Sequence, residues 1–155
     1  MSICHLIRVD ESFFDGYELP ETVQDALIFF MTEMSDDNNI PRHIMALLRS
    51  ARENPDMEEE KMIEEAQKYW LVDNIKQQLD RNESNKNLKI ECLHNIVCLC
   101  LDNYDTYKKL GKFIEVTDYK IKDLLDNVDK NCIYYVKAKE LQDLHIRDSL
   151  IPDST

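Results

Sequence analysis

Three of the five cysteines in the chain lie within nine residues of one another, and a histidine lies between them. Cys92, His94, Cys98 and Cys100 are residue types that bind zinc, and cysteine can also act as a nucleophile. On a helix, Cys92 and Cys100 share one face but lie about 12 Å apart along the axis, too far for one tetrahedral ion to bind both. We therefore expect no metal site, and we interpret these cysteines mainly as small apolar residues of a helix interior.

A catalytic cysteine needs a neighbouring base and surroundings that lower its pKa. Cys98 shares a more polar line of the predicted helix with Asp102, and acidic neighbours raise a thiol pKa. A redox-sensitive thiol at Cys98 remains an open alternative. The four histidines are scattered, and the chain contains no Gly-rich phosphate loop, G-x-S-x-G or H-E-x-x-H motif. The sequence therefore predicts a protein without enzymatic activity and without a cofactor.

The elements that carry these residues are predicted to be helices. Two glycines and four prolines are too few for the turns of an all-β or doubly wound fold. Amphipathic patterns and capping residues predict seven helices. Their approximate limits are 21–34, Pro41 to Asn54, a helix capped by Asp56 that runs to Leu79, 88–101, a short helix that ends at Leu110, 115–127 and 131–150. The fourth of these has an apolar stripe at helical spacing, made of Cys92, Leu93, Ile96, Val97 and Cys100.

Length and charge limit the organisation of the protein and its partners. A chain of 155 residues suits one domain, which we place at 20–151 between an irregular N-terminal arm (1–19) and a short tail (152–155). The net charge of −12 disfavours nucleic acid and anionic membranes and favours a basic or neutral protein partner. We expect a soluble cytoplasmic protein, with the nucleus as a second possibility. The odd number of cysteines fits a reducing compartment.

Three segments repeat one order: an apolar helix end, a polar break and another helix. They are "FFMTEMSDDNNIPRHIMALLRSARENPD", "NIKQQLDRNESNKNLKIECLHNIVCLCLDN" and "KIKDLLDNVDKNCIYYVKAKELQDL". Anchored on Met34, Leu79 and Leu125, the steps are 79 − 34 = 45 and 125 − 79 = 46 residues. This period, and the stretch from "YWLVDNIKQQL" to "KDLLDN", resemble armadillo and HEAT repeats over about residues 20–144.

The resemblance implies a right-handed array of about three helical units with a concave groove lined by third helices. In armadillo proteins an asparagine of that helix binds the backbone of an extended peptide. The matching positions here are Asn95, with Glu91 one turn earlier and His94 beside it, and Arg49, with Met45 one turn earlier. The function implied is that of a non-enzymatic adaptor or scaffold, as a subunit of a hetero-complex or a homo-oligomer.

Two alternatives stay open at this point. A compact bundle like the viral Bcl-2 proteins, which antagonise host signalling proteins, would also be helical, acidic and poor in glycine. Glu91 and Asn95 could instead belong to an ordinary solvated helix face. The acidic run from Glu58 to Glu60 also has two interpretations: it is either a solvated helix face or a docking site for a basic partner.

Overall fold

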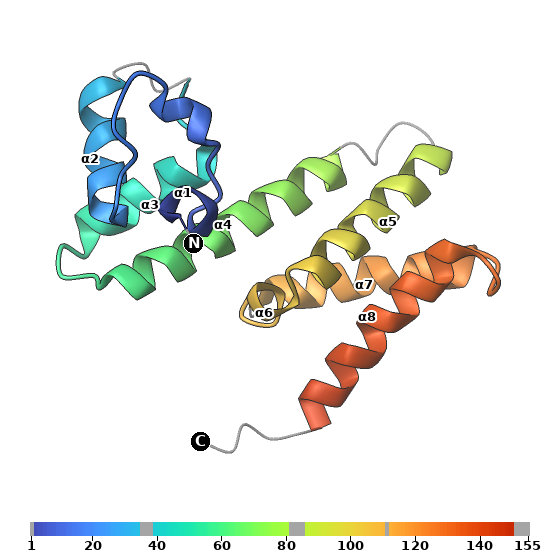
Figure 1. Ribbon diagram of the computed structural model, residues 1–155. Coiled ribbons are helices and arrows are strands. Elements are labelled where there is room, and N and C mark those ends of the chain that lie inside the picture. Colours follow the sequence, from blue (N-terminus) through green and yellow to red (C-terminus); the bar gives the residue numbers. More distant parts are fainter. Residues whose placement is uncertain (1, 35–38, 81–85, 111, 151–155) are drawn as a thin grey trace. The chain divides into compact units, whose positions relative to one another are not determined.

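The computed structural model describes residues 2–34, 39–80, 86–110 and 112–150, with side chains over 2–34, 39–80, 90–110 and 118–148. All regular elements in these ranges are helical, which confirms the predicted all-α class (Figure 1). They are α1 (Ile3–Leu6), the 3-10 helix η1 (Glu11–Phe14), α2 (Val23–Glu33), α3 (Arg42–Glu53), α4 (Glu59–Asp80), α5 (Lys86–Asp102), α6 (Tyr104–Tyr107), α7 (Lys112–Asn127) and α8 (Ile133–Leu150). None of the helices in the described part of the chain has the length and apolar character needed to cross a bilayer.

The chain divides into two compact units, Met1–Asp73 and Asn74–Thr155, and the division falls inside α4. The sequence predicted one domain at 20–151, and the division between the units lies inside that range. An apolar pattern along a helix shows which face is buried, but it does not show which helices share a core. Each unit is described separately below.

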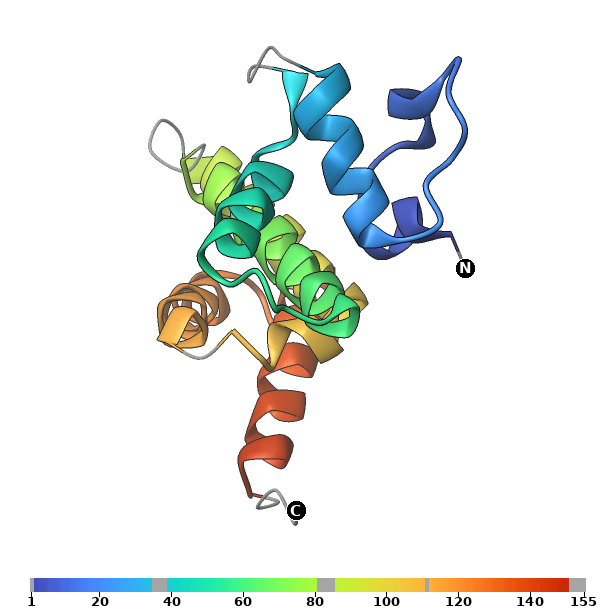
Figure 2. The same ribbon diagram turned by 90° about the vertical axis from the view of Figure 1, so that its left-hand side faces the viewer.

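In unit 1 the first residues of the chain belong to the core. The sequence predicted an irregular arm at 1–19, but Cys4, Ile7 and Phe14 are buried there together with side chains of α2, α3 and α4. The segment after η1 runs beside α2 to reach its N-terminus (Figures 1 and 2). The Phe14 ring lies 4.6 Å from that of Phe29 and 5.8 Å from that of Phe30, both on α2. Hydrophobic burial therefore holds residues 2–19 against the rest of unit 1. The helices in this segment are too short to show a periodic pattern in the sequence.

Capping groups fix where the helices of unit 1 begin. The Thr22 hydroxyl accepts a hydrogen bond from the Asp25 N–H at 3.1 Å, and this is a standard N-cap of α2. A carboxylate oxygen of Glu59, on α4, accepts from the Val23 N–H at 2.7 Å. This residue of the acidic run thus satisfies a free donor at the positive end of α2. Helix α3 begins after Pro41, as the sequence predicts.

His43, on α3, is the one buried polar residue among the described side chains. Its Nε2 lies 2.8 Å from the carbonyl oxygen of Ile7, which can only accept, so Nε2 carries a proton and donates. Burial lowers the pKa of His43, which favours the neutral imidazole. This hydrogen bond joins α3 to the turn after α1.

Unit 2 is built on three long helices that pack against one another: α5, α7 and α8 (Figure 1). The predicted apolar stripe of α5 is confirmed, because all five of its residues are buried: Cys92, Leu93, Ile96, Val97 and Cys100. Among the described side chains of the other two helices, the buried ones are Ile121 and Leu124 on α7 and Ala138 and Leu141 on α8. The core of this unit is therefore made where the apolar faces of the three helices meet.

The short helix α6 is joined to α7 and α8 by polar contacts. The Tyr107 hydroxyl donates to a carboxylate oxygen of Asp118 at 3.0 Å, and His145 Nε2 lies 3.3 Å from the other oxygen. Tyr104 donates to Asp148 at 2.6 Å. Burial raises the pKa of Tyr104 to about 12 and raises that of Tyr107 even more strongly, so both hydroxyls keep their protons and act as donors.

Candidate partner-binding surfaces

A hollow of about 280 Å³ opens on the surface of unit 1 between α2 and α3. We call it the α2–α3 groove. Its apolar lining consists of Phe30, Met31, Met34, Ile40, Met45 and Leu48, and the lining is completed by Arg49 and Arg52. The residues from α3 follow the spacing i, i+3, i+4 and i+7, which places them on one face of that helix. Two of the predicted partner-binding residues, Met45 and Arg49, therefore share a concave site.

The groove combines a deep apolar floor with cationic groups at the surface. Phe30, Ile40 and Leu48 are buried, whereas the Arg49 and Arg52 side chains are exposed. Neither arginine has an ion pair with any residue that the structure describes. Among the residues that the structure describes, no acidic side chain lines the groove, although 31 of the 155 residues in the chain are Asp or Glu. The groove is thus a local exception to the negative charge of the chain.

The other three predicted residues lie on α5, in unit 2. Glu91 and Asn95 are exposed and occupy successive turns of the same helix face. Their side chains make no hydrogen bond to the described residues, so both are available to solvent or to a partner. Asn95 can donate and accept at once, as a peptide backbone requires. This α5 face has the polar character that the armadillo resemblance implies, but a solvated helix surface would have the same character.

His94 is held by contacts within unit 2. Its ring lies 4.5 Å from the ring of Tyr134 on α8, and its Nε2 lies 3.5 Å from the sulfur of Cys98. These contacts leave His94 less available than Glu91 or Asn95 for a partner. The sequence placed it among the binding residues because of its position beside Asn95, but the packing of α8 against α5 determines its surroundings.

The Cys98–His94 pair has the composition of a nucleophile and its base, but its surroundings favour the uncharged forms. Burial raises the pKa of the Cys98 thiol, and it lowers the pKa of His94, which Lys137 lowers further. An activated cysteine requires the opposite shift for the thiol. The geometry therefore gives a weak neutral hydrogen bond in place of a thiolate–imidazolium pair.

Three of the remaining cysteines, Cys4, Cys92 and Cys100, are buried. Burial raises the pKa of Cys100 to about 12, so it is a thiol at neutral pH. All five cysteines are free thiols, and Cys98 and Cys132 are the two that are partly accessible. Over the described residues, no three His, Cys, Asp or Glu side chains are grouped so that they could hold a metal ion.

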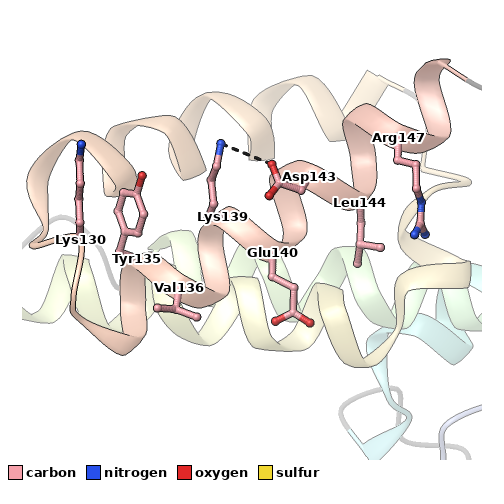
Figure 3. Close-up of a pocket in the computed structure, with 8 residues that line it drawn as sticks. All are labelled: Lys130, Tyr135, Val136, Lys139, Glu140, Asp143, Leu144 and Arg147. Atoms are coloured by element: carbon pink, nitrogen blue, oxygen red, sulfur yellow. Dashed lines mark ion pairs between the residues drawn. The ribbon is translucent and has the colours of Figure 1, made fainter.

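A second, shallower hollow of about 650 Å³ runs along the outer side of α8. Figure 3 shows that its residues come from α8 and the segment just before it, and that Lys139 turns toward Asp143. The two form an ion pair with Nζ 3.4 Å from Oδ1. The described lining holds three basic and two acidic side chains, so their charges largely cancel. This surface has the character of a solvated helix face, and it gives no preference for a partner of either charge.

Sequence reasoning found half of the α3 residues in the groove and none of those on α2. Met31 and Met34 lie three residues apart and Arg52 lies three after Arg49, so the spacing was present in the sequence. What was missing was the pairing of α2 with α3. An amphipathic pattern does not show which side of its apolar face a neighbouring helix will leave uncovered.

Comparison of the chain with protein-family models, with curated proteins and with solved structures finds no match.

Proposed function

We propose that the chain is an adaptor that binds a partner protein through its helical surfaces and performs no catalysis of its own. The observation that carries this proposal is the α2–α3 groove, where Met45 and Arg49 lie together over an apolar floor. Methionine side chains adapt to differently shaped partners, and arginine is enriched among the residues that dominate binding energy. An apolar concave centre with polar groups at its edge is the usual anatomy of a protein interface.

The helix order in unit 2 supports an armadillo-like arrangement as part of this proposal. The long helix α5 is followed by the four-residue helix α6 and then by α7 and α8, which both pack on α5. An armadillo repeat has a short first helix and longer second and third helices. The order from α5 to α8 is that of a third helix followed by the first, second and third helices of the next repeat. In such an arrangement α5 is a third helix, and its exposed Glu91 and Asn95 would form an additional contact for an extended peptide.

The two-unit organisation gives less support to the Bcl-2-like alternative. That fold wraps one hydrophobic core around a central helix. Here Phe14 and Phe30 belong to a core in unit 1, whereas the apolar stripe of α5 is buried in unit 2. The exposed line of Glu91, Asn95 and Asp102 also leaves one side of α5 uncovered.

Site-specific photo-crosslinking tests the proposed function. A photoreactive amino acid replaces Met31 in the intact chain, and the matched control carries it at Ile28. The two side chains lie on α2 with similar exposure, 49% and 47%, but only Met31 lines the groove. After irradiation in an extract of cells that contain the protein, we expect a discrete adduct from position 31 and none from position 28.

The adaptor proposal is contradicted if both positions give equal labelling or if neither position gives an adduct. Either result would show that the groove has no partner of its own. An adduct with twice the mass of the chain would identify a second copy as the occupant. Mass spectrometry of the purified adduct distinguishes these outcomes.

A further inference from the structure

We propose that the α2–α3 groove binds an acidic amphipathic helix, whose apolar side chains enter between the methionines and whose carboxylates pair with Arg49 and Arg52. This inference rests on the proposed adaptor function and specifies the chemistry of the partner. It follows from the size, the lining and the charge of the groove.

The size of the groove suits side chains better than a cofactor. Small-molecule sites usually have volumes from about 300 to 1,000 Å³, and a cavity of about 150 Å³ holds one benzene-sized ring. The α2–α3 groove, at about 280 Å³, therefore accepts roughly two large apolar side chains. Two such anchors, three or four residues apart on one helix face, are the minimum pattern of helix-in-groove recognition.

The lining of the groove matches the apolar face of a helix. Phe30, Ile40 and Leu48 give a buried floor that changes little, while Met31 and Met45 at its sides have flexible side chains. A rigid floor with flexible sides can admit leucine, isoleucine or phenylalanine anchors without a unique shape. We therefore expect recognition of a pattern of apolar residues more than of one exact sequence.

The two arginines determine the charge of the partner. They lie three residues apart on α3, so their side chains project from neighbouring turns about 4.5 Å apart along the axis. A helix lying along α3 can present two carboxylates three or four residues apart to both of them. Each guanidinium can bind a carboxylate through two hydrogen bonds, which lysine cannot do. A basic helix would bring like charges together at the same place.

This local charge differs from the net charge, from which the sequence analysis expected a basic or neutral partner. Exposed charges are screened beyond about 8–10 Å at physiological ionic strength, so a docked segment interacts mainly with the groups beside it. Arg49 and Arg52 are the charged side chains in the described part of the groove lining. The net charge of −12 would slow the approach of an acidic partner without removing the contacts made on docking.

The test measures binding of the full chain to fluorescent helical peptides of roughly 16 residues, a length near the lower limit for a helix in water. The probe peptide carries leucines at i and i+4 and glutamates at i+1 and i+5. One control peptide has lysine in place of the glutamates, and another has serine in place of the leucines. Fluorescence anisotropy gives the dissociation constants.

Matched variants of the chain locate the binding site. Met31→Glu should weaken binding of the glutamate peptide at least tenfold, whereas Ile28→Glu on the same helix should leave it unchanged. The Arg49→Glu/Arg52→Glu double variant should also lose at least tenfold and should now prefer the lysine peptide. Lys76→Glu makes a charge reversal at an exposed position of α4 outside the groove and should have no effect. Circular dichroism verifies that each variant remains folded.

The proposal is overturned if the glutamate peptide does not bind at concentrations up to about 1 mM, or if it binds all variants equally. Binding to anionic lipid vesicles that depends on the arginine pair, without binding of the peptide, would overturn it in favour of a membrane surface. If the peptide fails while the crosslink from position 31 persists, the adaptor function stands and only the acidic helix is refuted.

Discussion

Replacing Phe14 by alanine tests whether the first residues of the chain hold unit 1 together. Phe14 is 2% exposed and lies 4.6 Å from Phe29 and 5.8 Å from Phe30, within the range of favourable aromatic contacts. Truncating a buried phenylalanine costs about 3–5 kcal/mol, because both the transfer energy and the contacts around the new cavity are lost. A unit of this size is stable by roughly 4–11 kcal/mol, so the variant should lose a large part of its stability.

Urea unfolding measures this loss, with Trp70 as the reporter. Trp70 is the single tryptophan of the chain, it lies in unit 1, and the Arg8 guanidinium carbon lies 5.4 Å from the centre of its ring. A loss of about 4 kcal/mol should lower the unfolding midpoint by about 2 M urea. The control is Tyr17→Ala, which removes an aromatic ring that is 54% exposed and should cost less than about 1 kcal/mol. If Phe14→Ala costs as little as this control, residues 1–19 are a dispensable arm and the reasoning is wrong.

Three further predictions concern titratable groups. Burial lowers the pKa of His43 in the folded chain, so its contribution to the free energy of unfolding is complete above the unfolded pKa of about 6.5 and is lost as the pH falls below that value. The slope of this loss is at most about 1.4 kcal/mol per pH unit. Urea unfolding at several pH values should show this loss in the wild type and not in His43→Gln. Ellman's reagent should label at most two of the five thiols of the native chain, Cys98 and Cys132, and the other three after unfolding. Tyr107→Phe should lower the free energy of unfolding by about 1 kcal/mol, because Asp118 loses a hydrogen-bond donor but is partly exposed to water. Urea unfolding followed by far-ultraviolet circular dichroism should detect this decrease.

Each of these predictions has an outcome that contradicts it. Parallel pH profiles for the wild type and His43→Gln would show that His43 titrates alike in the folded and unfolded chains. Labelling of three or more native thiols would show that at least one buried cysteine becomes accessible to the reagent in the native chain. An unchanged unfolding midpoint for Tyr107→Phe would mean that the hydroxyl gains nothing from Asp118 that water does not supply.

The helices were largely readable from local patterns in the sequence. Pro41 and Asn54 gave the limits of α3, and the spacing from Cys92 to Cys100 gave the buried side of α5. These features are local, since a helix is made by hydrogen bonds four residues apart and its buried face repeats every 3.6 residues. A short helix was also expected after the polar "DN" break, but it was placed up to Leu110, whereas α6 spans Tyr104–Tyr107. The N-terminal segment was missed, because four-residue helices are too short to show a period.

The candidate site was only partly predictable. Met45 and Arg49 were chosen from their places in a repeat pattern, and the structure puts them together in the α2–α3 groove. Met31 and Arg52 were missed because the groove depends on how α2 and α3 pack together, which the sequence pattern does not show. His94 was chosen for its position beside Asn95, but its ring packs against Tyr134 of α8, forty residues further along the chain.

By itself the sequence determined the helical class, the main helix limits, the buried stripe of α5 and the outward direction of Glu91 and Asn95. The tertiary structure alone decided that residues near the N-terminus complete a core, that the chain forms two units and that two arginines border an apolar groove. The reason is physical. Helix formation and amphipathicity depend on residues a few positions apart, whereas a core or a groove depends on which distant faces meet and on how completely they cover each other.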